Sequence, residues 1–182
     1  MAAYNLIGTT TVGAGGSSTV SFSSIPQTYT DLIVVGSVRS TSTTSNTGEY
    51  DVMVYRFNAT TSGYTARVIE GSGSAAVSSS QTTATGSGGG AYGRISDGGQ
   101  NNSLSGTSIF SSFNMYIPNY AGSTNKSWSF EYVAERNVTA SYMGMTAGLW
   151  SNTAAITEIT FALIVANYAE YSSFSLYGIK NS

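Results

Sequence analysis

Any acid–base or nucleophilic chemistry in this chain would have to come from carboxylates, because the sequence contains no histidine and no cysteine. Ser-His-Asp triads, Cys-His pairs and metal sites built on imidazole or thiolate all need one of these two residues. The hydrolase spacing Gly-x-Ser-x-Gly can be sought around GSGSAAV at 71–77, but a serine there has no histidine to act as its base. We therefore expect no enzyme and no catalytic residue.

The acidic residues offer one candidate pair for glycoside hydrolysis, Glu49 and Asp51. Two residues apart on a strand, they share a face, but a glycosidase needs two carboxylates facing each other across a cleft at roughly 5–9 Å. The simpler interpretation is a solvated strand edge near a loop. Glu131 lies opposite an aromatic strand face, so solvent exposure accounts for it. The turn ISDGGQNN (95–102) and the Gly-rich GSGGGAYG (86–93) lack the calcium and phosphate motifs, so we expect no cofactor or metal.

Aromatic side chains are the other group with binding potential, with 13 tyrosines and 2 tryptophans in the chain. On a β-sheet such rings can stack on sugars, fill a core or form a subunit interface. Trp128 and Trp150 lie in strong strand patterns, which favours burial in a core or an interface. As contact residues of an interface we name Trp128, Tyr120 and Tyr92.

The elements that would position these residues are β-strands, because apolar residues recur with period two along most of the chain. We expect about nine strands, at 18–22, 29–38, 49–57, 64–70, 109–117, 127–133, 141–150, 156–165 and 173–179. The segment NATTSG (58–63) is predicted to be a hairpin turn between two of them, and Pro118 ends the fifth. The strand at 141–150 stacks Met143, Met145, Ala147 and Leu149 on one face. No long helix is predicted.

One antiparallel sheet of this size would leave an apolar face in water, so we expect two packed sheets. The predicted fold is all-β, an antiparallel, jelly-roll-like β-sandwich that forms a single domain over residues 1–182. Residues 71–108 are rich in glycine and serine and have few large apolar groups. They are predicted to form a long loop, or alternatively an extended arm that orders against a neighbouring subunit.

The charge content excludes several classes of function. Charged residues make up 9% of the chain, against about 25% in an average domain. The net charge is −2 and the seven cations are scattered, so nucleic-acid binding is not expected. The longest apolar run, FALIVA at 161–166, is too short to cross a bilayer, and the N-terminus lacks signal-peptide features, so we expect synthesis in a cytoplasm without membrane association. Low net charge with many hydroxyls suits a protein held in an assembly.

Four stretches resemble a group of short virion proteins of tailed bacteriophages, in the same order along most of the chain. They are YRFNATTSGYTARVIEGSGS (55–74), IPNYAGSTNKSW (117–128), AGLWSNTAAITEITF (147–161) and SFSLYGIKNS (173–182). The ending LYGIKNS is the most specific of these. In the related sequences an acidic residue often follows the asparagine of the first stretch, where this chain has Ala59, Thr60 and Thr61.

The resemblance implies a non-enzymatic component of a phage particle, made in the host bacterial cytoplasm and located in the virion. Proteins of this kind commonly serve as capsid decoration or cement proteins, often as trimers. We therefore expect a protein that bridges capsid subunits, with the major capsid protein and its own copies, in a homotrimer, as partners. The alternative is a tail or head fibre module that binds a host surface polysaccharide.

Overall fold

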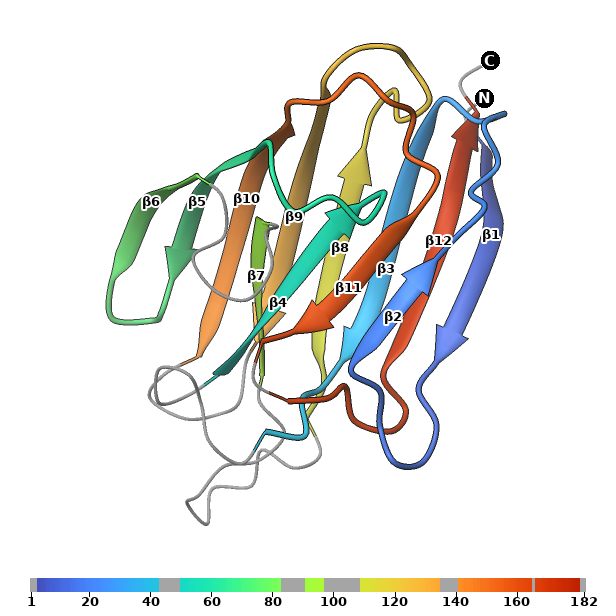
Figure 1. Ribbon diagram of the computed structural model, residues 1–182. Helices are drawn as coiled ribbons and strands as arrows, with labels where there is room; N and C mark the ends of the chain where they lie inside the picture. The colour runs from blue at the N-terminus through green and yellow to red at the C-terminus, as the bar shows by residue number, and fades with distance from the viewer. Residues whose placement is uncertain are drawn as a thin grey trace.

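The computed structural model describes residues 3–42, 50–82, 91–96, 109–134, 141–164 and 166–180. Over these ranges the regular structure consists of twelve β-strands in two antiparallel sheets that pack face to face (Figure 1). The predicted all-β antiparallel sandwich is therefore confirmed, while the jelly-roll topology stays a prediction. In the described residues no helix is long and apolar enough to cross a membrane.

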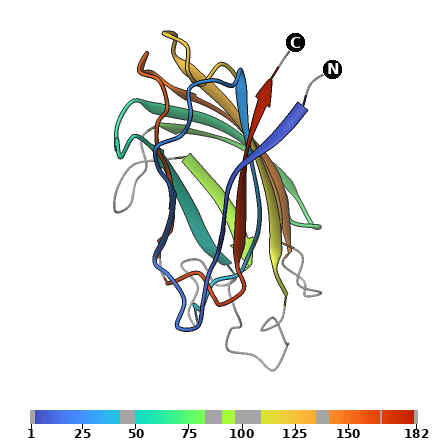
Figure 2. The same ribbon diagram turned by 90° about the vertical axis from the view of Figure 1, so that its right-hand side faces the viewer.

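The large sheet has eight strands and the small sheet four. In spatial order, the large sheet contains β1 (Ala3–Thr11), β12 (Ser173–Lys180), β3 (Asp31–Val38), β8 (Ser111–Ile117), β9 (Lys126–Ala134), β10 (Tyr142–Trp150), β5 (Tyr64–Gly71) and β6 (Ala76–Thr82). The small sheet contains β2 (Thr19–Phe22), β11 (Ile159–Leu163), β4 (Tyr50–Phe57) and β7 (Ala91–Ser96). Figure 2 shows the small sheet lying across one face of the large one. No other described strand covers the opposite face of the large sheet.

The core forms between the sheets because the strands alternate buried and exposed residues. In β8 and β9 every second side chain is buried, as a strand with one covered face requires. Aromatic rings fill much of the space: Tyr55 of β4 stacks on Phe130 of β9 with ring centroids 5.3 Å apart, and Phe57 meets Trp128 edge-on at 5.3 Å. The indole N–H of Trp128 donates to the Tyr55 hydroxyl at 2.7 Å, so the one polar atom of that ring is satisfied.

The nine predicted strands all occur, but the predicted number was too low. The prediction missed β1 and both strands inside residues 71–108, β6 and β7, so the long-loop interpretation of that segment was wrong where these strands lie. They belong to different sheets: β6 pairs with β5, and β7 pairs with β4. Hydrogen bonding to β5 orders the hydroxyl-rich sequence of β6, although this strand has no large apolar face of its own. Residues 83–90 and 97–108 lie outside the described residues.

The predicted hairpin at 58–63 was also wrong, because β4 and β5 lie in different sheets. The segment is a crossover turn, and Asn58, Ala59 and Gly63 all adopt positive φ angles of 49°, 55° and 82° in it. The Asn58 side chain holds the turn against the 155–158 segment: its Nδ2 donates to the Ala155 carbonyl at 2.8 Å, and its Oδ1 accepts from the Thr157 N–H at 2.9 Å. Sequence alternation cannot tell a hairpin from such a crossover, because both join two strands through a short turn.

In β10 the face with the large apolar side chains is exposed, although residue type would suggest that it is the buried face. Met143, Met145, Ala147 and Leu149 share a face as predicted, but that face points to solvent. The inner face carries Gly144 and Gly148 opposite the large rings of β9. A Cβ on Gly144 would lie 2.6 Å from the Tyr132 hydroxyl, and one on Gly148 would lie 2.1 Å from the Trp128 ring. The glycines are therefore required by the rings packed over them.

Candidate functional site

The candidate site is the exposed outer face of the large sheet, where β10 carries its large apolar side chains. Pairing registers place these residues next to one another: Met143 lies between Val133 of β9 and Gly71 of β5, and Met145 lies between Glu131 and Ile69. The four large apolar side chains therefore form one patch across three adjacent strands. Their exposed fractions are 65% for Ile69, 64% for Met143, 51% for Met145 and 45% for Val133. We call these four residues the apolar patch.

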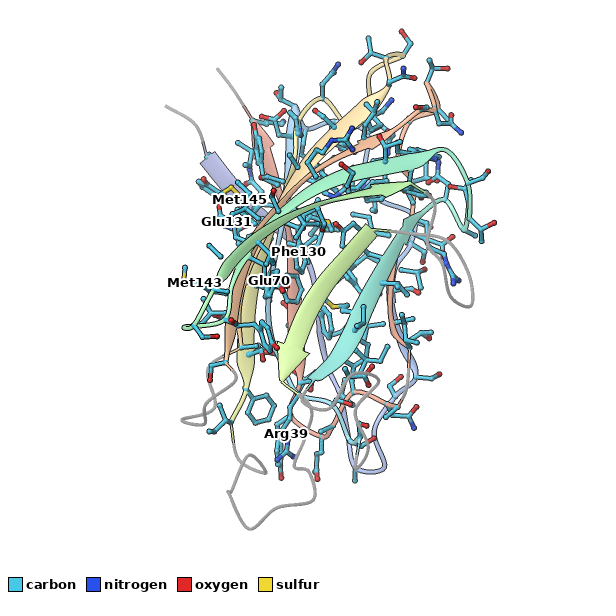
Figure 3. All side chains as sticks on the ribbon, turned by 90° about the vertical axis from the view of Figure 1, so that its left-hand side faces the viewer. Arg39, Glu70, Phe130, Glu131, Met143 and Met145 are labelled. Atoms are coloured by element: carbon cyan, nitrogen blue, oxygen red, sulfur yellow. The ribbon has the colours of Figure 1, made fainter. Side chains whose placement is uncertain are left out.

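A hollow of about 390 Å³ opens on the apolar patch. Gly71 accounts for part of its shape, because it lies in register between Met143 and Ala76 and adds no side chain there. A Cβ at Gly71 would meet only the Met143 side chain, at 4.0 Å, so nothing else fills that position. Figure 3 shows Met143, Met145 and Glu131 on the outer side of the sheet and Phe130 on the side that faces the small sheet. The hollow can accept a protruding apolar side chain from a partner surface.

Few charges surround the apolar patch. On the outward positions of β5, β8, β9 and β10 the charged side chains are Arg67 and Glu131, and most other positions carry serine, threonine, asparagine or small apolar residues. Glu131 is exposed, as predicted, beside Met145. Glu70 belongs to the opposite face, where it is buried and accepts a hydrogen bond from the Tyr132 hydroxyl. The patch can therefore be dehydrated with little loss of charge solvation.

The contact residues named from the sequence lie elsewhere. Trp128 is 3% exposed and Tyr120 is fully buried, so both are core residues of the chain itself and their rings are not available to a partner in this fold. The Tyr120 hydroxyl donates to the Pro26 carbonyl, which ties the 118–125 turn to the small-sheet side. Trp150 is also buried. The side chain of Tyr92 lies outside the described residues.

Asp51 is buried and fully engaged, which corrects the expectation of a solvated strand edge. Its Oδ2 accepts from the Ser40 hydroxyl at 2.8 Å and from the Ala166 N–H at 3.1 Å, and its Oδ1 accepts from the Val52 N–H at 2.8 Å. Such a carboxylate holds backbone segments together and has little access to a substrate. Glu49, the other member of the candidate pair, lies outside the described residues.

Lys126, the first residue of β9, is a buried cation that contacts the loop between β8 and β9. It is 1% exposed, and its ammonium donates to the carbonyls of Gly122 at 2.6 Å, Thr124, and Thr153 at 3.3 Å. Burial lowers the pKa of Lys126 below its ordinary value. The IPNYAGSTNKSW stretch is therefore a structural turn. Lys126 binds carbonyls of this turn, and the Asn119 N–H donates to Asp31 at 2.9 Å.

The apolar patch was missed as a site because sequence alternation groups side chains by face without saying which face is covered. Met143, Met145 and Leu149 resemble core residues by type. The available signal was the opposite face of the same strand, where glycines at 144 and 148 alternate with Thr146 and Trp150. Two glycines in register with the aromatic residues of a neighbouring strand indicate a face packed under rings.

Comparisons with protein-family models, with curated proteins and with solved structures gave no significant match for this chain.

Proposed function

We propose that the chain is a non-enzymatic structural protein of a bacteriophage virion, a capsid decoration protein that docks on the capsid through the apolar patch and bridges capsid subunits. The observation that carries the proposal is the exposure of four large apolar side chains in the middle of a nearly uncharged sheet face. Such a surface is typical of a docking site, because isolated soluble domains rarely concentrate apolar groups on one open face.

Two further features support this function. The stretches at 55–74, 117–128, 147–161 and 173–182 resemble phage virion proteins, and they include the crossover turn and the Lys126 loop that close the sandwich. The candidate carboxylate Asp51 is engaged in structural hydrogen bonds, which favours a structural role over a hydrolytic one. The polysaccharide-binding alternative gains no support from the tryptophans, since both are buried and cannot stack on a sugar ring.

The capsid surface that fits the apolar patch is itself apolar, with a side chain that enters the hollow. Burying a large apolar side chain completely is worth roughly 1.5–3 kcal/mol, so a half-exposed one contributes about 1 kcal/mol on docking. Replacing both methionines by serine should therefore cost about 2 kcal/mol, or roughly 30-fold in the dissociation constant. Attachment should depend only weakly on salt, because Arg67 and Glu131 are the charged side chains on the outward positions of β5, β8, β9 and β10.

The test uses particles of the phage that encodes the chain, grown without its gene and then mixed with the purified protein. Co-sedimentation should show saturable binding at a stoichiometry that approaches the major capsid protein, whereas a fibre module would bind in far fewer copies. The Met143→Ser/Met145→Ser variant should bind roughly 30-fold more weakly. Glu131→Gln is the matched control, because Glu131 is paired with Met145 across β9 and β10, and this variant should bind like the wild-type protein.

Three results would refute the proposal. The first is the absence of this chain from purified wild-type particles by mass spectrometry. The second is release of the bound protein by moderate salt, which would show that charge holds it. The third is equal binding by the double methionine variant, which would place the docking site elsewhere on the molecule.

A further inference from the structure

The second surface of interest is β6, the last strand at one end of the large sheet (Figure 1). Within the described residues β6 pairs with β5 alone, so its other edge carries backbone N–H and C=O groups with no strand beside them. All the side chains from Ala76 to Ser80 are exposed, on both faces of the strand. Val77 is 55% exposed, beyond the reach of the small sheet. β6 therefore lies outside the region where the two sheets pack against each other.

Nothing in β6 protects this edge from pairing with another strand. Edge strands are usually protected by charged side chains, proline, a β-bulge or short length. The sequence AVSSSQT contains neither charge nor proline, and its seven residues pair with β5 without a register shift. The other end of the same sheet differs, because β1 has an irregularity between Leu6 and Gly8. In the small sheet the edge strand β2 has only four residues.

The strand also gains little from the fold of a single chain. Its residues are ordered by one ladder of hydrogen bonds, and residues 76–80 bury neither face, although ordering a residue costs conformational entropy. A second ladder on the free edge would satisfy the remaining backbone groups, and it would bring a second strand alongside Val77. The geometry therefore favours a partner that is itself an extended strand.

We propose that β6 pairs antiparallel with β6 of a second copy of this chain around a two-fold axis, which makes one sheet continuous across both copies. In an antiparallel two-fold contact the residue on the axis meets its own counterpart, so a charged residue there would face a like charge. β6 has no charge, and serine hydroxyls both donate and accept hydrogen bonds, so the strand is complementary to itself. This inference does not rest on the virion assignment.

Sedimentation equilibrium of the purified full chain over a range of concentrations tests the proposal. The wild-type protein should show a reversible monomer–dimer equilibrium. Ser79, at the middle of β6, is exposed and faces Val68 of β5 in register. Ser79→Lys should raise the dimer dissociation constant at least about tenfold, because two ammonium groups approach each other across the axis. An equimolar mixture of Ser79→Lys and Ser79→Glu should recover a dimer.

Two controls separate this effect from damage to the fold. Ser79→Thr keeps a neutral hydroxyl and a strand-favouring side chain, so it should dimerise like the wild type. Asn5→Lys places the same charge on β1, at the opposite end of the sheet, and should leave the dimer intact. All variants should retain the wild-type circular dichroism spectrum and melting temperature, since both positions are exposed.

A wild-type protein that stays monomeric at the highest soluble concentration would overturn the proposal. So would a dimer or trimer that Ser79→Lys leaves unchanged, because its contact would lie elsewhere. The Met143→Ser/Met145→Ser variant should still dimerise, since its changes lie on the sheet face and not on its edge. Failure of this inference and failure of the capsid-docking proposal are therefore distinguishable.

Discussion

Two buried tyrosines, one with and one without a hydrogen-bond partner, allow the contribution of a buried hydroxyl to the stability of this core to be measured. Tyr55 and Tyr168 are both fully buried. The Tyr55 hydroxyl accepts from the indole N–H of Trp128 at 2.7 Å, whereas the Tyr168 hydroxyl has no hydrogen-bond partner among the described residues. Replacing each tyrosine by phenylalanine removes one oxygen and keeps the ring. The two variants should therefore change the stability in opposite directions.

The magnitudes follow from the hydrogen-bond partners. Tyr168→Phe removes an unsatisfied buried hydroxyl, whose desolvation costs roughly 1–3 kcal/mol, so the variant should be more stable than the wild type by up to that amount. Tyr55→Phe leaves the Trp128 N–H buried without an acceptor, so it should be less stable by a similar amount. Urea unfolding at neutral pH, followed by tryptophan fluorescence, measures both free energies of unfolding.

The pH dependence provides an independent check. Burial raises the pKa of Tyr168, with a smaller contribution from the negative charge of Asp51, and burial likewise raises the pKa of Tyr55. The native state therefore keeps these protons above about pH 10, where the unfolded chain releases them, so stability falls as the pH rises, by about 1.4 kcal/mol per pH unit for each tyrosine. Each variant should reduce that slope by about 1.4 kcal/mol per pH unit, the contribution of the tyrosine that it removes.

Either of two results would refute this reasoning. If Tyr168→Phe destabilises the protein as much as Tyr55→Phe does, the Tyr168 hydroxyl makes a stabilising hydrogen bond in solution. If neither variant flattens the alkaline loss of stability, the two phenols are not protected from ionisation by the fold, and the core is more open than the structure shows.

Substitutions at three other positions probe the polar contacts that join the loops, each measured by urea unfolding. Asp51→Asn should cost roughly 1–3 kcal/mol, because an amide cannot accept all the hydrogen bonds that the carboxylate accepts, and an unchanged stability would contradict the contacts described. Lys126→Met should cost a similar amount. It should also remove a rise in stability with pH below about pH 10.5, because the unfolded chain binds the Lys126 proton more strongly than the native state does. Asn58→Ala should cost about 2 kcal/mol and Asn58→Asp less, because the aspartate keeps the acceptor for the 157–158 amides.

The strands that could be predicted from the sequence are those with one covered face. In β8 and β9 the alternation of large apolar and polar residues follows directly from burial between the sheets. β6 could not be predicted in this way because its residues 76–80 are exposed on both faces, so no alternation was needed to form it. The pairing partners of β4 and β5 could not be predicted either, since they depend on contacts between residues far apart in the sequence.

Two of the three candidate contact residues, Trp128 and Tyr120, are core residues of the chain, and the reason is different. Trp128 and Tyr120 were named because large aromatic rings are common in interfaces, but the same rings are also the largest groups available to fill a core. The distance between two packed sheets has to be filled, and in this chain the rings of β4 and β9 fill it. Residue type alone cannot distinguish the two uses, whereas the glycines opposite the rings can, since they mark the covered face.

The fold of a single chain does not require the apolar patch to be apolar, which is why the patch points to a partner. Gly144 and Gly148 already fit β10 against the rings of β9, while the outward positions of β9 include two serines, so hydroxyls are compatible with this face. Met143→Ser/Met145→Ser should therefore lower the free energy of unfolding of the isolated protein by no more than about 2 kcal/mol, the contribution of the buried parts of the two side chains. A loss well above that value would mean that the methionines stabilise the chain itself, and their exposure would then be no evidence for docking. A loss within that value together with weakened particle binding would assign their apolar character to the contact with the capsid.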